Sequence, residues 1–287
     1  MPTIKKVVKK VAPFNEELMG YIKAGQAERQ RFMDLSEDIK RISPKDSFPH
    51  FYIYSQAGLG KSHTVKSTFE KANIKNYSII NGGLTMNGFI NEISVIVRQL
   101  KKNEHYYVYL EDCTGLFNDE ENCNIMKNVL RDEKKISYHK NPTRILNDAS
   151  PIQREALTYF MSDNNGINIP TDKLIFIFTS NRKLPTQDEI RRNIDNDLYA
   201  IRSRVNPVDF YMKPTTMWGY ITDIILTSPY LPKSIPQKIK EEACQFLWDN
   251  WHNFNSRSIR EMERMIEKYV KYPKDYKTKW LNEFVKK

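Results

Sequence analysis

Short apolar runs alternate with helical periodicities over the middle of the chain. Between Phe48 and Met212, β-rich stretches are separated by segments whose apolar residues recur at helical spacing. This alternation favours an α/β fold with a parallel sheet covered by helices. The expected strands are Phe51–Tyr54, Tyr77–Ile80, Tyr106–Leu110, Leu174–Phe178 and roughly Val205–Tyr211.

Helical patterns without strands occupy both ends of the chain. Asn15 to Ile42 carries apolar residues at helical spacing, and Ser43-Pro44 ends it because a residue before proline disfavours the helical conformation. After residue 212 we expect four helices, at Thr216–Leu226, Pro236–Trp251, Ser258–Lys271 and Lys277–Val285. We therefore predict three parts: a basic N-terminal arm and helix (1–46), an α/β core (47–212) and a small all-helical domain (213–287).

Length and charge narrow the classes of partner. The 287 residues suffice for one α/β core with a smaller helical appendage. Lysine and arginine outnumber aspartate and glutamate by 45 to 35, which gives a formal net charge of +10. This excess favours a polyanionic partner, although a solvated basic surface explains the same count. The lysines of the N-terminal arm leave a similar choice: contact with nucleic acid or a neighbouring subunit, or a solubilising tail.

Cysteine usage and hydropathy bear on the compartment. Cys113, Cys123 and Cys244 are odd in number and include no C-x-x-C pair, which argues against a zinc site or a disulfide framework. No run approaches the ~18 apolar residues of a membrane span, and no apolar segment follows the basic N-terminus as in a signal peptide. We therefore expect a soluble cytoplasmic protein without a membrane partner.

The most specific chemical pattern is SQAGLGKS, residues 55–62, directly after the first apolar run. Gly58 and Gly60 allow backbone N–H groups to turn toward a phosphate chain. Lys61 places a cation against phosphate, Ser62 offers a hydroxyl to Mg²⁺, and the next helix directs its positive end at the same anion. Serine replaces the usual first glycine, and a plain glycine turn is the alternative interpretation. The expected nucleotide contacts are Ser55, Gln56, Ala57, Gly58, Leu59, Gly60, Lys61, Ser62 and His63.

A second pattern is the acidic pair Glu111-Asp112 at the end of the third expected strand. Open α/β sheets bind ligands at the carboxyl ends of their strands. A nucleotide-bound Mg²⁺ needs a carboxylate, and a hydrolytic water needs one as base. An acidic pair after a strand also occurs in ordinary solvated loops, but its position after a phosphate loop favours function.

At this point the chain resembles an AAA+ ATPase over roughly residues 47 to 271. SQAGLGKS is similar to the family's Walker A motif and YYVYLED, residues 106–112, to its Walker B motif. The resemblance implies a P-loop parallel five-stranded sheet flanked by helices, a small helical lid, and ATP and Mg²⁺ as cofactors. By position Glu111 takes the metal role beside Ser62, and Asp112 the catalytic role. The usual order is Asp followed by Asp or Glu, so which carboxylate does what stays open.

Three further motifs are identified by the same resemblance. Asn181, at the end of the fourth strand, matches sensor 1, whose amide positions the attacking water. Ala200-Ile-Arg-Ser-Arg204 resembles the box that supplies an arginine finger, with Arg204 preferred and Arg202 as the alternative. Arg257, in Asn255-Ser-Arg-Ser-Ile259, matches sensor 2 of the lid. Surface ion pairing is the competing interpretation for Arg204 and Arg257.

In the family this arginine finger serves the neighbouring subunit's site, so the resemblance implies self-association into a ring, as a hexamer or a pentamer. Two loops would then face its channel. The first spans residues 82–89 and the second residues 131–172, with a short helix at Ile152–Met161. Basic residues interleaved with rings in the second loop suit a nucleic-acid strand, or form only a charged connector. The candidate substrate contacts are Leu84, Met86, Lys134, Lys135, Tyr138 and Lys140.

These features predict a Mg²⁺-dependent ATPase that couples nucleotide turnover to remodelling or loading on nucleic acid, with a helicase or clamp as candidate protein partner. Protein remodelling and a nucleotide-dependent scaffold with little hydrolysis are the alternatives. The first alternative is weakened because no aromatic residue stands between apolar ones at Leu84-Thr85-Met86. Within the family the pattern is similar to ATPases encoded by tailed phages, which implies a host-cell cytoplasm.

Overall fold

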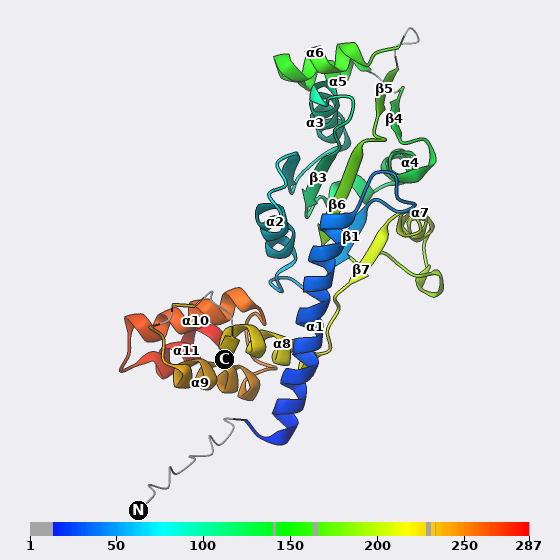
Figure 1. Cartoon of the computed structure of the whole chain (residues 1–287). Coiled ribbons are helices and arrows are strands. Elements are labelled where there is room, and N and C mark those ends of the chain that lie inside the picture. Colours follow the sequence, from blue (N-terminus) through cyan, green and yellow to red (C-terminus); the bar gives the residue numbers. More distant parts are fainter. Residues whose placement is uncertain (1–13, 140–141, 163–165, 228–230, 233, 287) are drawn as a thin grey trace, which may run out of the picture. The chain divides into compact units, whose positions relative to one another are not determined.

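The structure is a computed structural model that describes residues 14–139, 142–162, 166–227, 231–232 and 234–286 (Figure 1). The chain groups into two compact units, and each is treated by itself. A sheet unit comprises the described residues within 35–56 and 61–211, and a helical unit comprises the described residues within 14–34, 57–60 and 212–286. The expected division at residues 46 and 212 into three parts stays a prediction.

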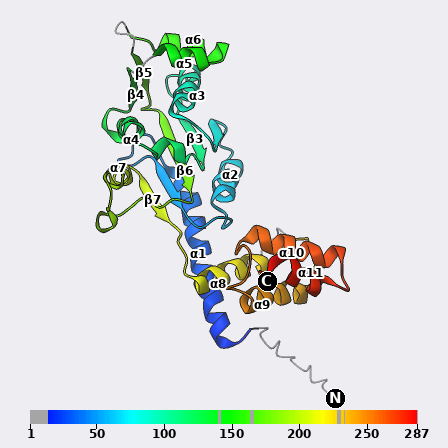
Figure 2. The ribbon, with the colours of Figure 1, turned by 180° about the vertical axis from the view of Figure 1, so that it is seen from behind.

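The sheet unit is built on five parallel strands in the order β2-β3-β6-β1-β7. They are β1 (Phe51–Tyr54), β2 (Tyr77–Asn81), β3 (Tyr106–Glu111), β6 (Leu174–Ser180) and β7 (Asn206–Asp209). Every residue of the central strand β6 is buried, as in a sheet covered on both faces. Figure 2 shows the same sheet from behind, again with helices around it.

Successive side chains of β3 point to opposite faces of the sheet, and different helices pack on each face. Tyr107 and Tyr109 point to the face of α2 (Lys61–Lys71), where the ring of Phe69 lies 5.5 Å from that of Tyr107. Val108 and Leu110 point to the other face, in one buried cluster with side chains of three helices. These helices are α3 (Met86–Gln99), α4 (Glu120–Lys127) and α7 (Asn193–Arg202). The expected fold class, a five-stranded parallel sheet flanked by helices, is therefore confirmed.

The segment at residues 131–172, expected as a long loop with a short helix at Ile152–Met161, contains that helix as α6 (Pro151–Tyr159) and also further structure that was not expected. Strands β4 (Lys135–Tyr138) and β5 (Ile167–Pro170) form an antiparallel pair, and α5 (Pro142–Asp148) and α6 lie between them in sequence. The alternating burial of Ile136 and of Ile167 and Ile169, which join the main apolar cluster, explains why these residues form strands. These two strands were not predicted, because a period-2 pattern of four residues is short.

The first expected channel loop, at residues 82–89, is also shorter than predicted. β2 ends at Asn81, and Thr85 caps α3 by accepting a hydrogen bond from the Gly88 N–H at 3.1 Å. Met86 is the first helical residue and is 7% exposed, because it packs into the apolar cluster. Only Gly82–Thr85 therefore remain as a loop.

The helical unit combines the start of α1 (Glu16–Arg41) with four later helices. These are α8 (Pro214–Thr227), α9 (Gln237–Asp249), α10 (Ile259–Lys271) and α11 (Tyr276–Phe284). Trp218 and Trp280 are fully buried, and each indole N–H donates to a backbone carbonyl, of Cys244 and Met265 respectively. None of the described helices combines the length and apolar character that a membrane crossing requires.

α1 and α8 approach closely at a pair of glycines. A Cβ on Gly219 would overlap the Tyr21 carbonyl oxygen, and one on Gly25 would overlap the Tyr220 backbone nitrogen. One turn further along, Asp223 is buried and accepts hydrogen bonds from Arg29 at 2.8 Å and Gln26 at 3.0 Å. The two helices are thus held together by close backbone packing and by a buried carboxylate whose oxygens accept hydrogen bonds from the other helix.

We expect Gly219→Ala to destabilise the protein by about 2–3 kcal/mol, because the new methyl group meets backbone rather than a flexible side chain. Gly20→Ala is the matched control. A Cβ there meets nothing within 4 Å, so the better helix former should stabilise by about 0.5–1 kcal/mol. Urea unfolding followed by circular dichroism measures both changes. Equal stabilisation by the two substitutions would contradict the α1–α8 contact.

Candidate nucleotide-binding site

The turn from β1 into α2 has the backbone that its sequence predicts. Gly58 has φ of 73° and Gly60 of 99°, a region that residues with a Cβ rarely adopt. Lys61 is the first residue of α2, so the loop opens directly into a helix N-terminus. Ser55, at the position of the usual first glycine, is not among the described residues with positive φ. Serine is therefore tolerated there without backbone strain.

Lys61 is the centre of a polar cluster at the end of the sheet. Its side chain is 7% exposed, and its ammonium donates to the carbonyl oxygens of Ser55 at 3.0 Å and Gln56 at 3.2 Å. A third bond, of 2.7 Å, reaches Oδ1 of Asn181 just beyond β6. The structure thus brings together the lysine of the loop and the amide of the expected sensor.

Burial of Lys61 is opposed by nearby carboxylates. Burial lowers the pKa of the Lys61 ammonium below its ordinary value, while the charges of Asp112 and Glu111 act in the opposite direction. An anion bound at this position would further favour the charged lysine. The cluster therefore has the electrostatic character of a site for a negatively charged ligand.

The two carboxylates at the end of β3 differ in their surroundings. Glu111 pairs with Lys66 of α2, with Nζ–Oε2 at 2.7 Å. Asp112 has φ of 53°, and its N–H donates to the Thr179 carbonyl of β6 at 3.0 Å. A left-handed backbone costs free energy in a residue with a Cβ, and such strain concentrates at functional sites. Asp112 is exposed, so its carboxylate is open to water.

Two side chains near these carboxylates were missed from the sequence. Tyr109 is fully buried, bonds Thr179 Oγ1 at 3.0 Å, and has a pKa raised to about 12 by burial, against an opposing hydrogen bond with Ser62. Lys66 is the partner of Glu111. Periodicity places Lys66 one helical turn after Ser62 and Tyr109 on the same strand face as Glu111, but it does not report that Lys66 and Glu111 meet.

Oxygen ligands for a hydrated divalent cation are present at this end of the sheet. Ser62 offers a hydroxyl and Glu111 a carboxylate, both next to Tyr109. Among the described residues no group of three or more His, Cys, Asp or Glu could hold a metal ion by itself. Mg²⁺ typically takes one or two protein oxygens together with phosphates and waters, so the residues fit that ion and not an all-protein metal cage.

The apex of the loop, residues 57–60, packs with the helical unit. The Gly58 carbonyl accepts from the Ile259 N–H at 3.2 Å, and the Leu59 carbonyl accepts from the Tyr220 hydroxyl at 2.9 Å. A Cβ on Gly58 would overlap that of Ser258, the N-cap of α10. The segment expected to be sensor 2 therefore begins α10 directly against the apex of the loop.

Arg257, the expected sensor-2 arginine, contacts its own unit. Its guanidinium donates to the carbonyl oxygens of Trp251 at 2.5 Å and His252 at 3.0 Å, and lies 5.3 Å from the Trp251 ring centroid. These bonds fix the side chain near the start of α10. A role at a phosphate would require it to exchange them.

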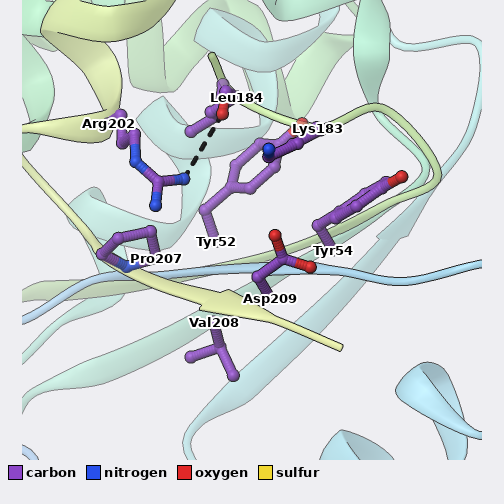
Figure 3. A pocket seen from close by; sticks show the side chains of 8 residues that line it. All are labelled: Tyr52, Tyr54, Lys183, Leu184, Arg202, Pro207, Val208 and Asp209. Atoms are coloured by element: carbon purple, nitrogen blue, oxygen red, sulfur yellow. Dashed lines mark hydrogen bonds between the residues drawn. The ribbon is translucent and has the colours of Figure 1, made fainter. Parts of the chain in front are cut away.

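The two candidate finger arginines lie at the end of α7, in the sheet unit. Arg204 donates to the Ala200 carbonyl at 2.8 Å, and Arg202 to that of Leu184 at 3.3 Å. Figure 3 shows Arg202 in a small pocket with Tyr52 and Tyr54 of β1 and Asp209 of β7. Arg202 thus lines a small pocket within the sheet unit, whereas Arg204 does not.

The expected substrate contacts do not form one loop cluster. Leu84 is half-buried in the short loop, whereas Met86 is buried at the start of α3. Lys135 and Tyr138 are on strand β4, Lys135 pairs with Glu133 at 2.8 Å, and Lys134 donates to the Pro44 carbonyl at 3.4 Å. Lys140 lies outside the described residues. His63, expected at the nucleotide, is exposed on the first turn of α2.

Comparisons with known proteins find remote likenesses of structure. No protein-family model matches the chain, and no curated protein matches it. Similar solved structures include the RuvB Holliday junction branch migration motor of Thermotoga maritima, with TM-score 0.47, 11% identity, and coverage of 90% of this chain and 68% of that chain. A DNA replication initiation factor is similar with TM-score 0.44 and 14% identity, over 90% of this chain and 65% of that chain. The replication initiator DnaA bound to AMPPCP and single-stranded DNA is similar with TM-score 0.42 and 14% identity, over 94% of this chain and 66% of that chain. The chain spans about two thirds of each.

Contact between Gly58 and Ser258 predicts a specific pattern of stabilities. Gly58→Ala should destabilise by about 1–3 kcal/mol through its positive φ, and by more through overlap with Ser258. Gly60→Ala carries only the first cost, because its nearest neighbour is the Tyr220 hydroxyl at 3.5 Å. Denaturant unfolding compares the two.

A double-mutant cycle with Ser258→Gly isolates the overlap, since glycine replaces an N-cap serine at a cost of only a few tenths of a kcal/mol. In that background, Gly58→Ala should cost about as much as Gly60→Ala. Persistence of the difference would mean that Ser258 is not the obstacle.

Proposed function

We propose that this protein is a Mg²⁺-dependent ATPase of the AAA+ type that acts on nucleic acid. The observation that carries the proposal is the turn from β1 into α2. Two glycines with positive φ precede a buried lysine at a helix start, and that lysine contacts Asn181 from the neighbouring strand end. Backbone of this form, with this lysine, suits the phosphates of a nucleotide.

Lys61 and Asn181 have linked roles in this proposal. Lys61 binds β- and γ-phosphate oxygens, which replace the amide oxygen that the ammonium contacts at 2.7 Å. Asn181, released from that bond, orients the water that attacks the γ-phosphate. The contact between the two groups keeps the amide beside the ammonium that would bind those phosphates.

The carboxylates divide the remaining tasks. Asp112 is exposed on a strained backbone and is the general base for the attacking water. Ser62 and Glu111 would hold Mg²⁺, which when bound would neutralise charge on the phosphates. Lys66 competes for the same carboxylate through its 2.7 Å ion pair. Glu111 therefore does not present a free negative charge before nucleotide binds.

Assembly follows from the assignment of the finger. Arg202 is a wall of the pocket in Figure 3, so Arg204 is the better candidate to reach a neighbouring copy's γ-phosphate. An arginine acting in trans requires self-association, for which a closed ring is the usual symmetric solution. Arg257 acts from the lid in the same proposal. A helicase or clamp partner, and the likeness to phage-encoded members, remain hypotheses of the sequence.

Nucleic acid is favoured over a polypeptide substrate by the first loop and by charge. Residues 82–85 contain no aromatic side chain, and Phe89 is fully buried in α3. No ring is therefore available in this loop to grip a polypeptide. The net charge of +10 also suits a polyanion, for which a polypeptide offers no general counterpart.

Lys61→Ala should weaken Mg²⁺-nucleotide binding about ten- to a hundredfold, because it removes a charge-assisted contact of about 1.5–3 kcal/mol. Titration of a fluorescent ATP analogue measures the affinity. Lys71→Ala, an exposed lysine in the last turn of the same helix, is the matched control and should bind normally. Undiminished affinity in a folded Lys61→Ala protein would overturn the proposed function.

Complementation tests catalysis and assembly together. Asp112→Asn and Arg204→Ala proteins should each bind ATP and each hydrolyse it on the order of 10³-fold more slowly than the native protein. A mixture should recover activity, because some interfaces then combine an intact carboxylate with an intact arginine. Mixtures that co-assemble in sedimentation but stay inactive would indicate an arginine that acts within its own subunit or has only a structural role.

A further inference from the structure

The connection between α10 and α11 gathers positive charge at the surface of the helical unit. Residues 268–279, called the basic turn below, contain five lysines and one aspartate. Four of the chain's ten net positive charges therefore lie within twelve residues. Lys271, Lys274 and Lys277 are exposed. Charge of this density at one turn raises the local concentration of a polyanion.

Within the described part of the chain, only some of these lysines form ion pairs. Lys268 pairs with Glu283 at 2.7 Å, and Lys277 with Glu242 at 3.1 Å. Lys271, Lys274 and Lys279 have no carboxylate within ion-pairing distance among the residues that the structure describes. Bringing three such lysines together costs electrostatic free energy, which a bound anion would offset.

The basic turn rests on a rigid aromatic base. Tyr276 packs between Tyr269, with ring centroids 5.1 Å apart, and the buried Trp280, at 4.8 Å. The Tyr276 hydroxyl also bonds Glu242 at 2.7 Å. The lysines are therefore presented from a fixed backbone rather than from a loose tail, which reduces the entropy lost on binding.

One ring of the turn faces outward. Tyr272 is 44% exposed, and the Lys279 ammonium lies 5.1 Å from its ring centroid. Lysines beside an exposed tyrosine are the combination that binds a nucleic-acid strand, with cations on phosphates and a ring against a base. An acidic membrane surface is less suitable, because the apolar face of α10, with Met262, Met265 and Ile266, is buried and leaves only the single aliphatic side chain of Val270 exposed in the basic turn.

We propose that the basic turn is a nucleic-acid contact surface, with Lys271 and Lys274 on backbone phosphates and Tyr272 beside a base. The proposal rests on the proposed function, because it assigns the nucleic-acid partner to a particular surface of the same protein. It places that contact in the lid rather than in the loops of the sheet unit.

Fluorescence anisotropy of the full-length protein with a labelled DNA single strand and with the matching duplex, over a salt series, tests the assignment. The variant is Lys271→Gln/Lys274→Gln. Two lost phosphate contacts should reduce the slope of log affinity against log salt by about 1.8 for duplex and about 1.4 for single strand. Lys101→Gln/Lys102→Gln, which removes the same charge from exposed lysines of the sheet unit, should leave the slope unchanged.

The outcomes separate the two proposals. If the Lys271→Gln/Lys274→Gln protein keeps the native slope of log affinity against log salt, or if both double variants reduce it equally, the basic turn is not the contact surface. Nucleic-acid binding by the native protein would then still support the proposed function. Absence of binding by the native protein would overturn both the nucleic-acid part of the proposed function and this surface. If the Lys271→Gln/Lys274→Gln protein binds DNA as the native protein does but loses a native affinity for vesicles of anionic lipid, the basic turn is a membrane contact instead. Circular dichroism and binding of the ATP analogue show that each variant is folded.

Discussion

Burying the ammonium of Lys61 imposes a strict requirement on the end of the sheet. A charged group removed from water needs oxygen atoms around it, and here two are backbone carbonyls of the preceding loop and one is the Asn181 amide. The carbonyls of Ser55 and Gln56 can point inward only because the chain then reverses through glycines with positive φ. Asn181 reaches the same point because β6 pairs directly with β1. The shape of the loop and the pairing of β6 with β1 thus together supply the oxygen atoms that one buried cation needs.

Much of the sheet unit could be predicted because its signals are local. The β1 span was predicted to the residue, since a buried strand followed by a glycine loop leaves few alternatives. The order of the strands brought Lys61 and Asn181 together, as the family resemblance implied. The partners of the carboxylates were not predicted, because the Lys66–Glu111 pair depends on the distance between a helix and a strand distant in sequence.

The misses share a physical cause. Residues 135–138 and 167–170 are too short to show periodicity by themselves, and only their mutual pairing makes them strands. Met86 was expected in a loop, but the Thr85 hydroxyl caps α3 one residue before it, so burial follows from a capping bond rather than from composition. The apex of the phosphate loop likewise packs on Ser258 and Tyr220, about 160 to 200 positions later, which no local pattern reports.

The inserted hairpin of β4 and β5 is peculiar in how it joins the core. Its first and last residues, Lys135 and Pro170, face each other in register, and the Thr171 N–H donates to the Lys134 carbonyl at 2.7 Å. Topologically the segment is therefore a detachable module, since its deletion would leave two chain ends already side by side. Energetically it is not detachable, because Ile136, Leu157 and Ile169 are part of the same buried cluster as the central strands. Loss of this segment would thus leave the chain path intact but expose apolar side chains of the central cluster to water.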